Sequence, residues 1–162
     1  MTNYRRLRLP GATYFFTLCL QERGGTTLTD NIACLREAYR KTIAERPVTC
    51  PAIVILPDHL HAIWTEPADC VQFSERWRRI KARFSHALCD QFDPCDSKRR
   101  KRERGLWQRR FWEHAIRSEK DFIAAMDYCR TNPVRHGLVE EPEHWPYSSF
   151  TRRMGNTAHP TS

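Results

Sequence analysis

At the centre of the predicted fold lies Leu56-Pro57-Asp58-His59-Leu60-His61-Ala62-Ile63-Trp64. We interpret this stretch as the apolar end of one strand, a Pro-Asp turn and the start of a second strand. Because side chains alternate faces along a strand, His59 and His61 point to the same side while Leu60 points into the core. Two neighbouring imidazoles can bind a divalent cation and leave coordination positions for water or substrate. The alternative interpretation is a hairpin whose exposed face carries two histidines without a metal.

Strand and helix patterns continue on both sides of this hairpin. The expected elements are a strand at 12–20, a helix at about 30–44, hairpin strands at 52–56 and 59–65, a helix at about 71–89, a strand-like segment at 106–117 and a helix at 118–132. The last helix begins at the capping box Ser118-x-x-Asp121 and is expected to stop at Asn132, because Pro133 disfavours a helical residue before it. This order predicts an α+β fold of the split-βαβ kind, an antiparallel sheet of about four strands with packed helices.

The composition fits one folded domain that binds a polyanion. The chain has 162 residues and a formal net charge of +8, and nucleic acid is the commonest partner of such a basic protein. We expect a single domain over residues 1–150 and a disordered tail over 151–162. The 7 cysteines are scattered without a C-x-x-C pair, which argues against a disulfide framework and favours a reduced, cytoplasmic compartment. The apolar runs are too short to cross a bilayer, so no membrane association is expected.

Two groups of basic residues are candidates for contacts with DNA phosphates. Arg76, Arg79 and Arg83 recur along one face of the helix at 71–89. The second group is a like-charge block that contains Lys98, Arg99, Arg100, Lys101 and Arg102. The alternatives are a solvated helix face for the first group and a segment that only confers solubility for the second.

The last predicted helix carries a second pair of polar residues at a helical spacing. Tyr128 and Asn132 are one turn apart and therefore lie on the same face. Tyr128 falls at the border of the apolar stripe, where its hydroxyl can reach into a cleft. The alternatives are a border tyrosine that only packs its ring and an asparagine that only ends the helix.

These motifs together resemble a known family. The Leu-Pro-Asp-His-Leu-His segment is similar to the HUH motif (His, hydrophobic, His) of single-tyrosine transposases. Two further segments resemble the REP-associated tyrosine transposase branch, namely Trp107-Gln108-Arg109-Arg110-Phe111-Trp112-Glu113-His114 and Tyr128-Cys129-Arg130-Thr131-Asn132-Pro133-Val134-Arg135-His136-Gly137-Leu138-Val139. The resemblance covers the chain from roughly Pro10 to Phe150.

The resemblance implies a ferredoxin-like palm in which a helix presents the tyrosine to histidines on a central strand. It implies Tyr128 as the nucleophile and His59 and His61 as metal ligands. Related transposases use a glutamine four residues after the tyrosine as a further ligand. Asn132 stands at that place here, as in the REP-associated branch, and its side chain has a shorter reach.

The implied activity is endonucleolytic cleavage and strand transfer on single-stranded DNA beside a REP-like hairpin. Attack by Tyr128 would leave a 5′-phosphotyrosine linkage and a free 3′-hydroxyl. A tyrosine is a weak nucleophile at neutral pH, and a divalent ion, Mg²⁺ or Mn²⁺, would orient the phosphate and offset its charge. The resemblance further implies a cytoplasmic, nucleoid-associated protein and favours a monomer over a homodimer.

Two other functions compete with this one. A hairpin-binding protein that retains the fold without catalysis would bind nucleic acid independently of Tyr128 and metal. A nuclease that uses activated water would cleave without a covalent intermediate. The presence of His59, His61 and Tyr128 together argues against the first, and the absence of an acidic cluster argues against the second.

Overall fold

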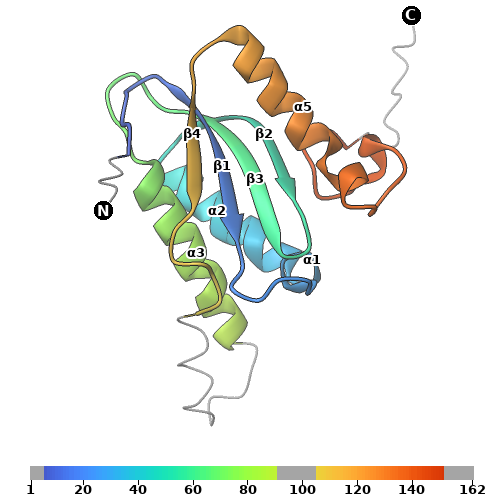
Figure 1. Cartoon of the computed structure of the whole chain (residues 1–162). Helices are drawn as coiled ribbons and strands as arrows, with labels where there is room; N and C mark the ends of the chain where they lie inside the picture. Colours follow the sequence, from blue (N-terminus) through green and yellow to red (C-terminus); the bar gives the residue numbers. More distant parts are fainter. Residues whose placement is uncertain (1–5, 91–104, 152–162) are drawn as a thin grey trace, which may run out of the picture.

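The computed structural model describes residues 6–90 and 105–151. Its elements are β1 (Thr13–Cys19), α1 (Thr27–Asp30), α2 (Ile32–Glu45), β2 (Thr49–Ile55), β3 (His59–Thr65), α3 (Phe73–Asp90), β4 (Trp112–Ile116), α5 (Glu119–Arg135) and the 3₁₀ helix η1 (Pro142–His144). The four strands form one sheet in the order β2-β3-β1-β4, and every neighbouring pair is antiparallel. The main elements follow one another as β1-α2-β2-β3-α3-β4, so the predicted α+β fold of the split-βαβ kind is confirmed (Figure 1).

One face of the sheet packs against α2 and α3 and holds the larger core (Figure 1). Leu60, Ala62 and Trp64 of β3 point to this face. The Trp64 ring stacks on Trp77 of α3 at a centroid distance of 3.9 Å, and both side chains are fully buried. The predicted inward direction of Leu60 is therefore confirmed.

The opposite face of the sheet is covered by α5 and by the segment that follows it. Phe15, Ile63, Cys129 and Trp145 form a smaller core there. Since strand side chains alternate, this is also the face toward which His59 and His61 point.

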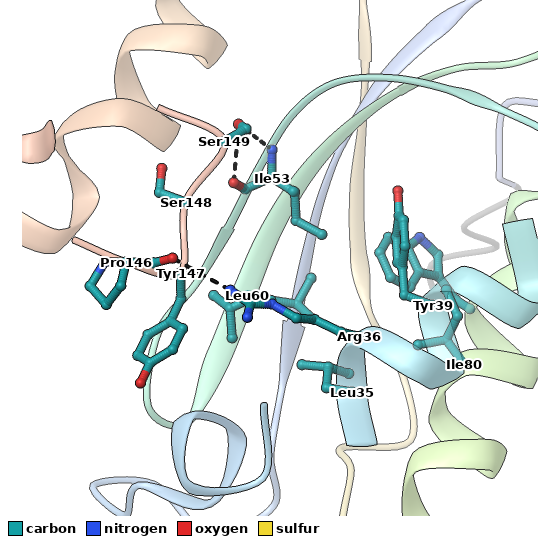
Figure 2. Close-up of a pocket in the computed structure, with 12 residues that line it drawn as sticks. Leu35, Arg36, Tyr39, Ile53, Leu60, Ile80, Pro146, Tyr147, Ser148 and Ser149 are labelled. Atoms are coloured by element: carbon teal, nitrogen blue, oxygen red, sulfur yellow. Dashed lines mark hydrogen bonds between the residues drawn. The ribbon is translucent and has the colours of Figure 1, made fainter. Parts of the chain in front are cut away.

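The segment after η1 protects the edge strand β2. The N–H of Ile55 donates to the carbonyl of Tyr147 at 2.8 Å, and the N–H of Ser149 donates to the carbonyl of Ile53 at 2.9 Å. The Ser149 hydroxyl also bonds to the backbone of Ile53 (Figure 2). The indole N–H of Trp145 also donates to the carbonyl of Ile55, at 2.8 Å. These bonds satisfy backbone groups that an open sheet edge would leave available for pairing with another chain.

The helix α5 runs through the proline that was expected to end it. Its N-cap is confirmed, because the Ser118 hydroxyl accepts the N–H of Asp121 at 3.1 Å. The predicted stop at Asn132 is wrong, since Pro133 lies inside the helix and is buried. Proline removes one N–H donor, and helical bonding resumes behind it when the N–H of His136 donates to the carbonyl of Asn132 at 3.0 Å.

Other boundaries differ less. The strand-like segment at 106–117 contains only the short β4, and an isolated bridge joins Trp107 to Leu20. The one-turn helix α1 falls where a loop and an N-cap were expected. The described residues end at Thr151, and the rest of the expected tail lies outside them.

Candidate active site

The two histidines of β3 lie side by side under α5. Their ring centroids are 5.1 Å apart, and the residues are 5% and 3% exposed for His59 and His61. The predicted placement of both rings on one face is therefore confirmed. This burial differs from the exposed hairpin face of the alternative interpretation.

A hydrogen bond at Nδ1 fixes the orientation of each ring. Nδ1 of His59 lies 2.6 Å from Oδ1 of Asp58, and Nδ1 of His61 lies 2.8 Å from Oγ1 of Thr17. Metal-binding histidines commonly hold their second nitrogen in this way, which fixes the tautomer and leaves Nε2 for the ion. Such a tautomer has Nδ1–H donating to the neighbouring oxygen.

Asp58 is itself held by the loop after β1. Its Oδ2 accepts hydrogen bonds from Nε of Arg23 and from the N–H of Gly24, both at 2.8 Å. Burial opposes ionisation, but the bonds from Gly24, His59 and Arg23 outweigh it and lower the pKa of Asp58 well below its usual range. The carboxylate beside His59 is therefore charged at neutral pH.

The histidines themselves are neutral at that pH. The pKa of His61 is lowered to about 3, mainly by burial and in smaller part by the nearby His59 and His136. Burial also lowers the pKa of His59, despite the opposing effect of Asp58. Neutral imidazole is the form that binds a metal.

Tyr128 of α5 faces this pair. Its ring centroid lies 5.1 Å from that of His61 and 5.7 Å from that of Phe15, and the residue is 38% exposed. The guanidinium of Arg135 lies 5.2 Å from the centre of the tyrosine ring. The predicted border position is confirmed, with the ring anchored and one side open.

Two buried polar atoms between β3 and α5 lack partners in the described part of the chain. They are Nε2 of His61 and Oδ1 of Asn132, and the latter residue is 1% exposed. A buried polar atom without a hydrogen bond is costly, so such atoms point to a water or an ion. Within residues 6–90 and 105–151, no group of three His, Cys, Asp or Glu side chains is arranged to hold a metal. Asn132 lies one turn from both Tyr128 and His136, whose rings contact those of His61 and His59, and an amide oxygen with two imidazole nitrogens is a donor set that fits a divalent cation.

His136 also belongs to this cluster, although sequence reasoning gave it no place there. Its ring centroid lies 5.0 Å from that of His59. The available signal was its position four residues after Asn132, which continues the face that begins at Tyr128. That signal was missed because the helix was expected to stop before Pro133.

A pocket of about 370 Å³ is lined in part by the Tyr128 side chain. Trp112 and His114 of β4 line it together with Phe15 of β1. The sequence predicted a strand-like segment here, but it did not place Trp112 beside Tyr128.

The prediction that Arg76 contacts DNA is wrong. This side chain is 1% exposed, and its Nη1 lies 2.8 Å from Oε1 of Glu66, which is equally buried. Its remaining N–H groups donate to the carbonyls of Arg46 and Pro47, each at 2.8 Å. Arg76 therefore joins α3 to the start of β2 and the end of β3.

The rest of the arginine row lies against α2. Arg79 and Arg83 both form ion pairs with Glu45, and Arg79 also pairs with Glu75. The helix that carries them, α3, packs on the face of the sheet opposite to α5 (Figure 1). The block that contains Lys98, Arg99, Arg100, Lys101 and Arg102 lies outside the described residues.

A second pocket, of about 240 Å³, lies between α2 and the segment that covers β2 (Figure 2). Leu35, Tyr39 and Leu60 give it an apolar wall, and Arg36 at its rim donates to the carbonyl of Pro146 at 3.5 Å. It is separated from the histidines by the sheet, so we do not assign it to the candidate site.

Among the described helices, none combines the length and the apolar character needed to cross a membrane.

Comparison with known proteins gives close relatives over almost the whole chain. The chain is 42% identical over 160 residues to the REP-associated tyrosine transposase of Escherichia coli K12, which covers 99% of this chain and 89% of that protein. It is 43% identical over 163 residues to a protein of Haemophilus influenzae assigned to the same family, covering 99% of this chain and 92% of the relative. No family model matches the sequence.

Solved structures agree with these relatives. A REP-associated tyrosine transposase bound to a REP hairpin superposes with a TM-score of 0.80 at 42% identity, covering 93% of this chain and 83% of that chain. A transposase-like crystal structure from Deinococcus radiodurans gives a TM-score of 0.50 at 15% identity, over 79% of this chain and 95% of that one, and shows the fold alone.

Proposed function

Because this chain belongs to the REP-associated tyrosine transposase family, we propose that it cleaves and rejoins single-stranded DNA beside hairpins through Tyr128. The observation that carries this proposal is the Tyr128 ring 5.1 Å from His61, next to two buried atoms that lack protein partners among the described residues. This arrangement supports a nucleophile next to a cation site.

The residues proposed to hold a divalent cation, Mg²⁺ or Mn²⁺, are His59, His61 and Asn132. The unpartnered Nε2 of His61 and Oδ1 of Asn132 support this assignment. The ion would supply charge stabilisation to the phosphate oxygens. Asn132 has a shorter side chain than glutamine, and it is buried in α5, the helix that packs against β3.

The chain's own residues bind and orient the reacting groups. The Tyr128 hydroxyl oxygen attacks the scissile phosphorus while the bond from phosphorus to the 3′-oxygen breaks. The tyrosine proton leaves and a proton is taken up by the 3′-oxygen, so the products are a 5′-phosphotyrosine and a 3′-hydroxyl. Arg135, whose guanidinium lies over the tyrosine ring, places a positive charge next to the developing anion.

The proposed partner is a REP-like DNA hairpin with adjoining single strand. A relative that shares 42% of its residues with this chain has been solved bound to a REP hairpin. The formal net charge of +8 supports the same partner. We propose a monomer that acts in the cytoplasm, associated with the nucleoid.

The experiment that tests this proposal looks for a covalent DNA adduct. The protein is incubated with labelled single strands that carry genomic hairpins, with Mg²⁺ or Mn²⁺, and products are separated on denaturing gels before and after protease treatment. We expect a protease-sensitive band that disappears in Tyr128→Phe and on addition of EDTA. Tyr147→Phe, which removes the hydroxyl of a tyrosine at the other pocket, should leave the band unchanged.

Two outcomes would favour the competing functions. Cleavage that persists in Tyr128→Phe would identify a nuclease that uses activated water. Hairpin binding without any cleavage, unaffected by Tyr128→Phe and EDTA, would identify a non-catalytic hairpin-binding protein.

A further inference from the structure

The pocket beside Tyr128 is bounded by β1, β4 and α5. Its lining includes Phe15, Trp112, His114, Asp121, Ala125 and Tyr128. Its volume of about 370 Å³ is large enough to admit a planar heterocycle, and the pocket is open to solvent. Because Tyr128 forms one wall, whatever enters this pocket lies next to the proposed point of attack.

Trp112 is the most unusual of these residues. It is 57% exposed, although a large apolar side chain on a strand would ordinarily be covered. Its ring packs edge-on against Phe15 at 5.8 Å and lies parallel to His114, with 5.9 Å between centroids and 7° between planes. The indole is therefore anchored by its neighbours while much of its surface stays accessible.

The charge of the pocket disfavours a phosphate. Asp121 contributes a carboxylate, which accepts the backbone N–H of Arg117 at 3.1 Å and lies 2.9 Å from Nε2 of His114. The bond with His114 lowers the pKa of Asp121, so the carboxylate is ionised at neutral pH. An anion would be repelled by it, whereas a nucleobase has no charge and offers N–H donors to a carboxylate.

We propose that this pocket binds one unpaired base next to the scissile phosphate, stacked on Trp112. Exposed aromatic rings are the usual platforms for bases of single-stranded DNA, because every base has a π-face. The inference rests on the proposed function, since Tyr128 locates the phosphate. It assigns Trp112 to substrate binding and to positioning of the cleaved strand.

The test measures DNA binding without chemistry. All variants carry Tyr128→Phe and are studied in EDTA, so no adduct forms. The probes are a fluorescein-labelled hairpin with short single-stranded extensions and the same hairpin with blunt ends. The variants are Trp112→Ala, Trp112→Phe and the control Ile123→Ala, which removes a side chain on α5 that is 60% exposed and is not among the pocket's lining residues.

We expect Trp112→Ala to raise the Kd for the extended hairpin by roughly 5- to 150-fold, the loss of one base stack. Trp112→Phe should recover most of the affinity, and the blunt hairpin should bind all variants equally. An abasic site scanned along the extensions should weaken the parent at one position, and Trp112→Ala should be insensitive at that position.

Equal affinity of Trp112→Ala and its parent for the extended hairpin would overturn the inference. An equal loss with the blunt hairpin would also overturn it. Neither result depends on covalent chemistry, which the adduct assay tests with the unmodified protein. A covalent adduct without a Trp112 effect on binding would therefore leave the proposed function standing.

Discussion

Asp58 is not a proposed metal ligand, but its carboxylate orients the proposed ligand His59. Its Oδ1 holds Nδ1 of His59 at 2.6 Å, while Arg23 and Gly24 fix the carboxylate from behind. We expect Asp58→Asn to weaken Mn²⁺ binding by about 10- to 100-fold, the usual effect of removing such a partner. Titration calorimetry measures this directly.

The matched control for this substitution is Asp69→Asn, which neutralises an exposed carboxylate between β3 and α3. Thermal unfolding of both variants without metal shows whether the fold is retained. If Asp58→Asn binds Mn²⁺ as tightly as Asp69→Asn does, the carboxylate does not position His59.

Side chains of the candidate site were predictable from sequence only where local geometry decides their direction. The shared face of His59 and His61 follows from strand alternation, and that of Tyr128 and Asn132 from the helical repeat. Trp112 could not be placed beside the tyrosine, because its neighbourhood depends on β4 pairing with β1 rather than on the residues around it.

The packing of α3 depends on the buried ion pair between Arg76 and Glu66. From the charge pattern alone, Arg76 was assigned to a row of DNA-binding arginines. We expect Arg76→Ala to lower the free energy of unfolding by about 3–5 kcal/mol, because Glu66 would remain as an unpaired buried charge. Arg79→Ala removes two partly exposed ion pairs and should still cost less than Arg76→Ala, about 1 kcal/mol. Urea denaturation gives both values.

The same two variants test whether the arginine row binds DNA. Folded Arg76→Ala should bind a hairpin with extensions as well as the unmodified protein does, measured at a temperature where both are native. A decrease in stability of less than about 1 kcal/mol in Arg76→Ala would contradict the structural role of this pair.

Lys81 of α3 makes stability depend on pH in the alkaline range. Burial lowers its pKa to about 8, and its Nζ donates to the carbonyl of Gln108 at 3.0 Å. Between about pH 8 and the unfolded value near 10.4, the unfolded chain binds more protons than the folded one. The contribution of Lys81 to stability therefore rises with pH across this window.

We expect Lys81→Met to flatten the pH dependence of Tm over that window and to raise Tm most near pH 7, where the buried charge is unfavourable. Lys120→Met on the exposed start of α5 is the control and should leave the slope unchanged. Identical slopes for Lys81→Met and the unmodified protein would show that the lysine does not titrate in this way.

The end of α5 marks a limit of sequence reasoning about elements. A proline disfavours a helical residue before it, but this is a preference that burial can outweigh. Pro133 is buried together with Asn132 and Cys129, so packing under the helix holds the backbone helical. Tertiary contacts decide whether burial outweighs the preference of proline. Because α5 continues past Pro133, His136 at its end lies next to His59.

The two faces of the sheet have different roles, and the order of the strands explains why. Because β3 and β1 are the central strands, residues that alternate along them divide between a core under α2 and α3 and a site under α5. The order of elements was readable from sequence and predicted this fold. The face on which each helix lies was not readable, so the sequence could not show that Arg79 and Arg83 of α3 pair with Glu45 of α2.

Because Arg76 is buried and Arg79 and Arg83 each pair with Glu45, we propose that charge for DNA binding comes mainly from the basic block Lys98, Arg99, Arg100, Lys101 and Arg102. Each phosphate that a protein neutralises on a single strand steepens the dependence of log K on log salt by about 0.7. We expect replacement of the five residues by serine to reduce this slope by about 0.7 for every phosphate that the block neutralises in the unmodified protein, measured by fluorescence anisotropy over a salt series.

Arg79→Ala with Arg83→Ala should leave the slope unchanged, since both pair with Glu45. An unchanged slope in the serine variant would mean that the block confers solubility only, and that phosphates are bound by exposed arginines nearer the site, such as Arg135 beside Tyr128.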